Sequence, residues 1–499
     1  MRSIAAAVIT LAAAMLGFGA PVVAQAAPEG LRHCAVSSGR VPETATPEEV
    51  GLDAAALREA VALAADSTRT TVQIFRNNCL IATGPDSARA AGVPWNLWSS
   101  TKSVVSMVAG IAVDEQRLRL DDPIGAYLPP ELGDARHRAI TVRNLLIESS
   151  GMQVAVASEG ITGLAQIDPN VVAQALAMPI DQQQGTEWRY SQRAVDLLVY
   201  VIQRAVGEDF QAYAQRKLFD PLGIPPTDYF WGRDRSGNTY GYAHLLLPPD
   251  DFAKLGLLLT NRGQWGEHRI ISADYLAQAG RPAPTNPCYG FLFVVNGPDC
   301  ANYFPGLPPD AMQMSGMMRQ DNYIVPSLGL MVSWTGVTVP GSALSFPHDV
   351  LRAVGAAFRE PRIPAAAPYE QQSDVQLSDP MISNPDATLA ALGVGPMATR
   401  AAIRCPAWAS PCPLRSRIGH RGASSSAASG RTRRPLGSGS DTPPSGASER
   451  VSRQGRTDPE RPCRTTPNDR RAGACRSLSC LSCCHRVNSE RRARVSRRS

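Results

Sequence analysis

Residues 98–115 read WSSTKSVVSMVAGIAVDE, and this stretch decides the fold. Residues 99–115 predict a buried helix, because beyond Ser103 they are almost wholly apolar. Ser99 and Lys102 stand three residues apart at the start of this helix, so both side chains lie on one face with Cβ atoms about 5–6 Å apart. Burial of the apolar residues would carry the hydroxyl and the amine into the protein together.

Two effects favour the neutral form of the Lys102 amine in this setting: loss of water, and the positive end of the helix dipole. A neutral amine can accept a proton from a serine hydroxyl, which makes that oxygen a nucleophile. A serine three residues before a lysine also arises by chance. Here, however, the pair follows a predicted hairpin, opens an apolar helix and uses one of only three lysines, against 47 arginines.

Two later segments could complete a site around this pair. Tyr190-Ser191-Gln192 lies between a polar run and an apolar helix, residues 194–205. Tyr190 taken singly is typical of a core residue, but as a partner it would share a proton with Lys102 and Ser99. Met314-Ser315-Gly316-Met317 comes just before a predicted strand. A glycine there lets the backbone approach a substrate closely, and an edge strand offers N–H groups to a carbonyl oxygen.

The remaining pattern predicts strands and helices at both ends around a helical middle. The following segments carry it: a helix over 47–65, a hairpin of Thr71 to Phe75 and Leu80 to Thr83, a largely helical stretch to about 275, strands at Tyr289 to Asn296, Asn322 to Val325 and Gly329 to Trp334, and a helix over 348–359. This order favours an α/β lobe with an inserted helical lobe.

Composition divides the chain into a body and a tail. Residues 401–499 carry 21 Arg, no Lys and 6 acidic residues, a net charge of +15, whereas residues 1–400 carry 29 basic and 38 acidic residues, a net charge of −9. A basic nucleic-acid-binding body is therefore not expected. Residues 361–499 are too poor in core residues to fold, so we expect a disordered tail. It is either a basic arm for nucleic acid or membranes, or a frame-shifted extension without function.

The first 26 residues predict a secretory signal peptide, with Arg2, an apolar run from Ile4 to Gly17 and a cleavage site at Ala24-Gln25-Ala26. The run is shorter than the ~20 residues that span a bilayer. We expect an exported protein, periplasmic or secreted, with no transmembrane segment after cleavage and a folded domain over residues 27–360.

The four body cysteines then suggest disulfides. Three pairings are possible; Cys288–Cys300 would close a short loop, leaving Cys34–Cys79.

The three pieces around Ser99, Tyr190 and Gly316, in this order, resemble the serine β-lactamase and penicillin-binding-protein superfamily, which carries S-x-x-K, S-D-N and K-T-G signatures. The class C side, where Y-x-N replaces S-D-N, is most similar, especially 6-aminohexanoate-dimer hydrolases and esterase-type members. Supporting stretches lie at 47–52, 118–129, 140–151, 218–224, 251–256 and 263–266. The resemblance covers roughly residues 45–358. It implies an α+β fold of the β-lactamase/transpeptidase type, with an antiparallel sheet flanked by helices and an all-helical lobe.

The resemblance also assigns roles. Ser99 would be the acylated nucleophile, Lys102 its base partner, and Tyr190 the group that relays the proton and activates water. The backbone N–H groups of Ser99 and Met317 would hold the oxyanion, beside Ser315 and Gly316.

Two positions depart from the pattern. Gln192 stands where the family often has Asn, so contact with substrate is shifted. Met314 stands where β-lactamases and cell-wall peptidases have Lys or His, and a cation there would pair with a substrate carboxylate.

The sequence therefore predicts an exported serine hydrolase that cleaves an ester or amide bond of a small molecule through an acyl-enzyme, without a metal or organic cofactor. The alternatives are a DD-peptidase or β-lactamase, and a member that binds a ligand or peptidoglycan without turnover. The body histidines His33, His137, His244, His268 and His348 are isolated, with no metal-ligand spacing.

Overall fold

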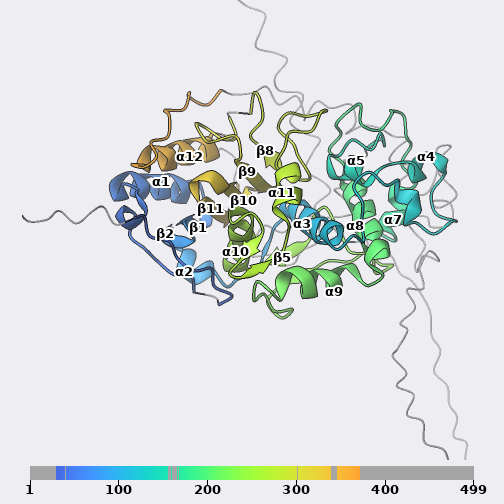
Figure 1. The fold of residues 1–499 in the computed structure, drawn as a ribbon, viewed down its shortest axis with the longest axis horizontal. Helices are drawn as coiled ribbons and strands as arrows, with labels where there is room; N and C mark the ends of the chain where they lie inside the picture. Colours follow the sequence, from blue (N-terminus) through green and yellow to red (C-terminus); the bar gives the residue numbers. More distant parts are fainter. Residues whose placement is uncertain are drawn as a thin grey trace, which may run out of the picture. The chain divides into compact units, whose positions relative to one another are not determined.

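The computed structural model describes residues 30–39, 41–154, 159, 166, 168–300, 302–338 and 345–370 (Figure 1). All of them belong to the first of two compact units, residues 1–421. The predicted signal peptide, residues 1–26, and residues 371–499 of the predicted tail lie outside the described residues. Within the described ranges, no helix is both long and apolar enough to cross a membrane.

An antiparallel sheet of six strands forms the centre of the α/β part, in the order β2-β1-β11-β10-β9-β8. The strands are β1 (Arg69–Arg76), β2 (Cys79–Thr83), β8 (Val294–Val295), β9 (Met312–Gly316), β10 (Gln320–Val325) and β11 (Leu330–Gly336). The first hairpin is thus paired with the last strand, Val72 opposite Trp334. Segments from the two ends of the described chain therefore lie side by side in the sheet.

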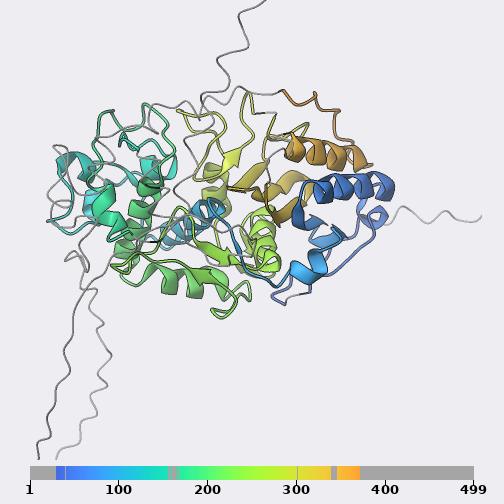
Figure 2. The same ribbon diagram turned by 180° about the vertical axis from the view of Figure 1, so that it is seen from behind.

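Helices cover both faces of this sheet (Figures 1 and 2). On one face α1 (Ala54–Asp66) and α12 (Phe346–Ala357) pack side by side over a core that includes Trp334. On the other face α10 (Pro249–Thr260) contacts β10 and β11. The chain's apolar residues form two buried clusters as a result, one on each face.

The middle of the chain supplies the helical part. Its helices are α4 (Ala135–Arg138), α5 (Val142–Leu146), α7 (Val171–Ala175), α8 (Gln192–Val206), α9 (Phe210–Ala214) and the π-helical turn η3 (Gln215–Phe219). Helix α3 (Ser100–Asp114) contacts α8 on one side and β9 on another. Nearly every α3 residue is buried, which explains its apolar sequence. The predicted α/β lobe with an inserted helical lobe is confirmed.

Short elements complete the fold. A second sheet has the order β3-β5-β4, and a two-stranded ribbon pairs β6 with β7. Their bounds, and those of the small helices, are β3 (Trp95–Asn96), β4 (Phe230–Trp231), β5 (Leu245–Leu247), β6 (Gln264–Trp265), β7 (His268–Arg269), α2 (Ser87–Ala90), α11 (Ala273–Ala279), η1 (Glu48–Val50), η2 (Ile124–Ala126) and η4 (Pro326–Leu328).

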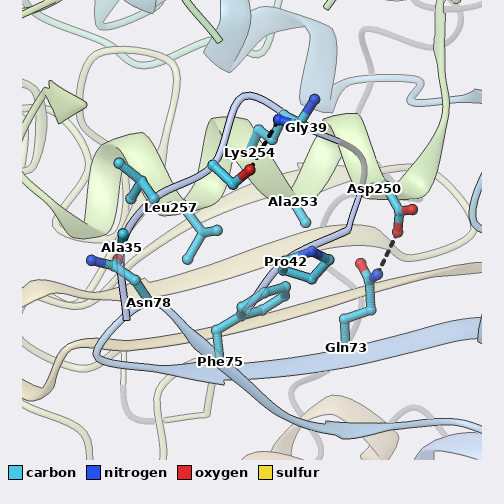
Figure 3. A pocket seen from close by; sticks show the side chains of 12 residues that line it. Ala35, Gly39, Pro42, Gln73, Phe75, Asn78, Asp250, Ala253, Lys254 and Leu257 are labelled. Carbon is cyan, nitrogen blue, oxygen red and sulfur yellow. Dashed lines mark hydrogen bonds between the residues drawn. The ribbon is translucent and has the colours of Figure 1, made fainter. Parts of the chain in front are cut away.

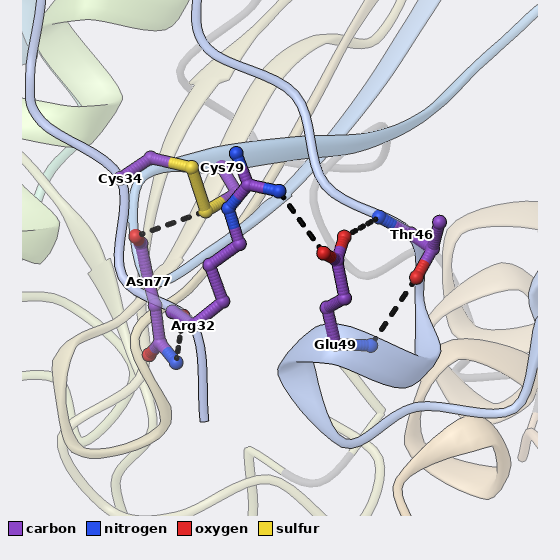
Figure 4. Close-up of a disulfide and its surroundings, with 6 residues drawn as sticks. All are labelled: Arg32, Cys34, Thr46, Glu49, Asn77 and Cys79. Carbon is purple, nitrogen blue, oxygen red and sulfur yellow. Dashed lines mark hydrogen bonds and ion pairs between the residues drawn. A yellow bond between two sulfur atoms is a disulfide. The ribbon is translucent and has the colours of Figure 1, made fainter. Parts of the chain in front are cut away.

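The N-terminal segment is fastened to the first hairpin. A disulfide joins Cys34 to Cys79, and Arg32 pairs with Glu49 beside it (Figure 4). Between residues 35–42 and α10 a small cavity remains, where Gln73 of β1 donates to Asp250 at the start of α10 (Figure 3). The second disulfide joins Cys288 to Cys300. Both favoured pairings are therefore confirmed.

Three predicted segments differ from the structure. The helix predicted over 47–65 begins only at Ala54, because Gly51 is left-handed (φ 79°) and the Asp53 side chain caps α1. Of the strand predicted at Tyr289 to Asn296, only Val294–Val295 is a strand, since Leu292 takes a positive φ of 61°. The segment containing Gly316, expected only to precede a strand, is itself β9.

Candidate active site

Ser99 and Lys102 meet at the first turn of α3, as their spacing predicts. Trp98 takes a positive φ of 48° where the chain turns from β3 into the helix. Ser99 is the N-cap, and its carbonyl accepts the N–H of Lys102 at 2.9 Å. The Lys102 side chain is 1% exposed, and its Nζ lies 3.3 Å from Ser99 Oγ.

Three further oxygens surround the Lys102 amine. Nζ lies 2.9 Å from the Tyr190 hydroxyl, 2.6 Å from Gln192 Oε1 and 3.4 Å from the carbonyl oxygen of Tyr242. The amide and carbonyl oxygens can only accept hydrogen bonds, whereas the two hydroxyls can also donate. A neutral amine with two N–H groups and one lone pair can therefore satisfy both obligatory acceptors and still accept a proton from Ser99 or Tyr190.

Lys102 also differs from the other two lysines in its charge environment. Lys217 pairs with Glu115, and Lys254 pairs with Asp251. Within the described residues, no carboxylate forms an ion pair with Lys102.

Helix α8 brings Tyr190 and Gln192 to the amine. Ser191 is the N-cap of α8, and its hydroxyl accepts from the N–H of Ala194. Tyr190 therefore stands just outside the helix and Gln192 is its first residue. The N–H of Gln192 donates to Glu159, whose side chain is buried. The predicted partner Tyr190 is thus brought to the Ser99–Lys102 pair, and Gln192 contacts Lys102 directly.

The β9–β10 hairpin packs against the turn that carries Ser99. A Cβ at Gly316 would lie 2.2 Å from the carbonyl oxygen of Leu97, so only glycine fits there. Ser100 Oγ donates to the Gln320 carbonyl of β10 at 2.7 Å. The edge strand β8 pairs with Met312 and Gln313 only, so the outer edge of β9 is not paired with β8 at Ser315 and Gly316. Met317 follows in the turn and is about half exposed.

A cleft of about 240 Å³ opens above the Ser99–Lys102 pair. Its walls carry the aromatic side chains of Trp188, Tyr190, Tyr289 and Tyr303, together with Ser315. Cys288 also lines it, so the second disulfide belongs to the wall. Lys102 is the one Lys or Arg side chain among the described lining residues.

Met314 of β9 is not among the described residues that line the cleft. Its side chain is fully buried and its sulfur accepts from Asn322 Nδ2 at 3.6 Å. It supplies no charge to the cleft. Within the described residues, no cluster of three or more His, Cys, Asp or Glu side chains is arranged to hold a metal ion.

Sequence reasoning missed Glu148, which lies just after α5. Its side chain is 1% exposed, its φ is +52°, and neither carboxyl oxygen makes a hydrogen bond of good geometry. Burial raises the pKa of Glu148 to about 8, against the opposing effects of the Lys102 charge, the Tyr289 hydroxyl and the Ser191 N–H. The sequence around Glu148 has no periodic pattern that would have singled it out. Its unusual features, the positive φ and the buried surroundings, are visible only in the structure.

Comparison with known proteins identifies a family and several similar proteins. The family model described as Beta-lactamase matches residues 87–347. Lovastatin esterase of Penicillium rubens is 27% identical over 156 residues, which are 27% of this chain and 39% of that protein. Protein flp of Staphylococcus aureus is 23% identical over 145 residues, 28% of this chain and 29% of that protein. The chain thus spans about a third of the length of these curated relatives.

Among solved structures, a β-lactamase from Mycobacterium bovis is similar, with 19% sequence identity and a TM-score of 0.46. The match covers 60% of this chain and 99% of that one.

The buried Glu148 carboxyl makes stability depend on pH. Unfolded chains ionise this group above its ordinary pKa of 4.5, whereas the folded protein keeps it protonated up to about 8. Folding is therefore opposed increasingly as pH rises between these values. We expect Glu148→Gln to be more stable than wild type by a margin that grows from pH 5 to pH 8, by up to about 1.4 kcal/mol per pH unit. Urea unfolding at fixed pH measures this margin.

Glu115→Gln is the matched control. Burial raises the pKa of Glu115, but hydrogen bonds from Lys217 and Tyr213 lower it overall, so its carboxylate is ionised in both states throughout pH 5–8. We expect Glu115→Gln to be destabilised by an amount that does not vary over this range. An equally flat margin for Glu148→Gln would mean that Glu148 is ionised in the fold.

Proposed function

The chain belongs to the beta-lactamase family, and on this premise we propose that it is a serine hydrolase that cleaves an ester or amide bond through an acyl-enzyme on Ser99. The observation that carries the proposal is the contact between Ser99 Oγ and the Lys102 amine, which is buried and has no carboxylate paired with it among the described residues. The same amine touches the Tyr190 hydroxyl, so a proton can pass between three groups within one small volume.

In the first half-reaction Ser99 Oγ attacks the carbonyl carbon of the substrate. Its proton passes to the Lys102 amine, directly or through the Tyr190 hydroxyl. The negative charge that develops on the carbonyl oxygen needs fixed donors. Among the described residues, the N–H of Ser99 donates to no backbone carbonyl, whereas the N–H groups of the next residues donate to carbonyls of the same turn. Met317 follows the part of β9 that is not paired with β8. We assign these two N–H groups to the oxyanion.

The first half-reaction ends when the departing alcohol or amine takes the proton from the Lys102–Tyr190 pair, which leaves Ser99 as an ester of the acyl group. The second half-reaction returns the enzyme to its starting state. Water then gives a proton to the same pair and attacks that ester, and the proton returns to Ser99 Oγ as the carboxylic acid departs. The Tyr190 hydroxyl suits this exchange because it lies in the cleft wall while touching the buried amine.

The cleft favours uncharged, apolar acyl groups. Its walls are largely aromatic, and its lining offers no cation besides Lys102 among the described residues. β-Lactams and the C-terminal peptides of cell walls carry a carboxylate that needs such a cation. Met314, at the position where a Lys or His would supply it, is apolar and buried. We therefore favour ester or amide cleavage over DD-peptidase or β-lactamase activity.

The role of Ser99 is tested by covalent labelling. We expect a fluorophosphonate to add once to the wild-type protein, at Ser99, and Ser99→Ala to lose both labelling and at least 10³-fold in p-nitrophenyl ester turnover, because the hydroxyl that forms the acyl-enzyme is then missing. Peptide mapping by mass spectrometry locates the adduct. Binding of esters without any release of product would instead identify a non-catalytic member of the family.

Substrate preference is tested with a panel matched in size. We expect kcat/KM for a neutral aryl ester to exceed that for a chromogenic cephalosporin by 10³-fold or more, since the described residues that line the cleft offer the cephalosporin carboxylate no cation besides the catalytic Lys102. Esters with and without a carboxylate on the acyl group provide the control for charge alone. Cephalosporin turnover comparable to ester turnover would make β-lactamase activity the better assignment.

We also propose that the protein acts outside the cytoplasm. Two disulfides in one body are typical of an oxidising compartment, and residues 1–26 have the pattern of a secretory signal. Expression of the full chain, followed by cell fractionation and N-terminal sequencing, tests this. We expect exported protein that begins near residue 27; uncleaved protein confined to the cytoplasm would refute export.

A further inference from the structure

The turn between β9 and β10, residues 317–319, has an unfavourable backbone conformation. Met318 and Arg319 both take positive φ angles, 60° and 62°, although neither is a glycine. Such a conformation persists only where surrounding contacts enforce it. The same turn contains Met317, whose N–H we assign to the oxyanion, so the contacts that hold the turn also bear on the proposed reaction.

Arg69, the first residue of β1, supplies several of these contacts. It is 6% exposed, and its Nη1 donates to the carbonyl oxygens of Met318 and Arg319, each at 2.7 Å. Its Nη2 donates to the carbonyl of Val337, just after β11, and its Nε donates at 3.4 Å to that of Ser67, just before β1. One planar guanidinium therefore ties the turn to the ends of two neighbouring strands.

A second buried side chain holds the turn from β10. Gln320 is 1% exposed, and its Nε2 donates to the carbonyls of Met317 and Met318 at 3.4 and 3.2 Å. Its amide also forms two hydrogen bonds with the main chain of Gly336, at 2.6 and 3.0 Å. The carbonyls of all three turn residues are thus held by Gln320 and Arg69.

These contacts determine where the Met317 N–H points. The Gly316 carbonyl accepts the N–H of Arg319 at 2.9 Å. The Gly316 carbonyl and the Met317 N–H belong to one trans peptide group, in which they point in opposite directions. Arg319 therefore fixes the direction of the Met317 N–H, and the Arg319 carbonyl is itself held by Arg69. Among the described residues, no backbone carbonyl accepts the Met317 N–H, so it is available to a substrate.

We propose that Arg69 is a positioning residue for the oxyanion site: its guanidinium holds the turn that directs the Met317 N–H toward the substrate carbonyl. This inference rests on the proposed function, in which the N–H groups of Ser99 and Met317 stabilise the oxyanion. It deepens that function, because charge stabilisation then depends on a side chain that is not among the described residues lining the cleft. Since the charge develops only in the transition state, loss of Arg69 should lower kcat and leave KM little changed.

Arg76, the last residue of β1, is the matched control. It is 3% exposed, and its guanidinium lies over the Phe358 ring at 4.4 Å, as that of Arg69 lies over the Phe346 ring at 5.3 Å. Arg76 donates to the carbonyl of Glu360 at 2.7 Å, at the opposite end of the strand from the β9–β10 turn. Replacement by lysine therefore removes a buried guanidinium from the same strand in both cases, but only Arg69 holds the turn.

The test compares kcat for an ester with kcat for its thionoester, in which sulfur replaces the carbonyl oxygen. Sulfur is a weaker hydrogen-bond acceptor than oxygen, so a well-positioned oxyanion site favours the ester. We expect Arg69→Lys to lower kcat for the ester about tenfold, with KM little changed, and to lower the ester-to-thionoester ratio about fivefold. The reason is that an ammonium cannot reproduce the planar fork that reaches the turn and both strand ends. Arg76→Lys should keep the wild-type ratio.

Two results would overturn the proposal. One is a folded Arg69→Lys protein with the wild-type ratio. The other is an equal fall of the ratio in Arg76→Lys, because the loss would then come from general destabilisation. If Arg69→Lys does not fold, Arg69→Gln, which is neutral and leaves no unpaired buried charge, is judged by the same ratio. Retained turnover in Ser99→Ala would instead reject the proposed function itself, so the two failures are distinguishable.

Discussion

The arrangement of this site depends on one buried amine, that of Lys102. The Lys102 Nζ sits among four oxygens, two of which can only accept hydrogen bonds, and no carboxylate among the described residues pairs with it. Such a group is stable only if surrounding elements hold every oxygen in place. Three separate parts of the chain do so: the first turn of α3, the start of α8, and the segment around Tyr242. The fold can thus be understood as the scaffold that brings these parts together.

The other side of the cleft depends on a steric constraint. Gly316 lies so close to the Leu97 carbonyl that no side chain fits, and the Ser100 hydroxyl fixes the neighbouring strand to the same turn. The free edge of β9 is therefore held beside Ser99. In the proposed mechanism, the groups that transfer the proton and those that stabilise the oxyanion are both positioned by contacts to a single turn, residues 97–100.

Much of this could be predicted from the sequence, because it follows from local chemistry. The Ser99–Lys102 spacing, the apolar run of α3 and the place of Tyr190 just before an apolar helix are readable in a few neighbouring residues. The strand at Tyr289 to Asn296 failed because a positive φ at Leu292 and a disulfide override β-propensity there. Glu148 could not be found, since its environment is made by residues 102, 159 and 289, far apart along the chain.

The central claim is that the Lys102 amine makes the Ser99 hydroxyl reactive. The most direct measurement is the rate at which a fluorophosphonate labels Lys102→Met, followed by intact mass spectrometry on protein shown to be folded. The account predicts that this variant, with the amine replaced by an apolar chain of similar length, stays unlabelled while wild type gains one adduct. Labelling at the wild-type rate would contradict it, because Ser99 would then be activated by something other than the amine beside it.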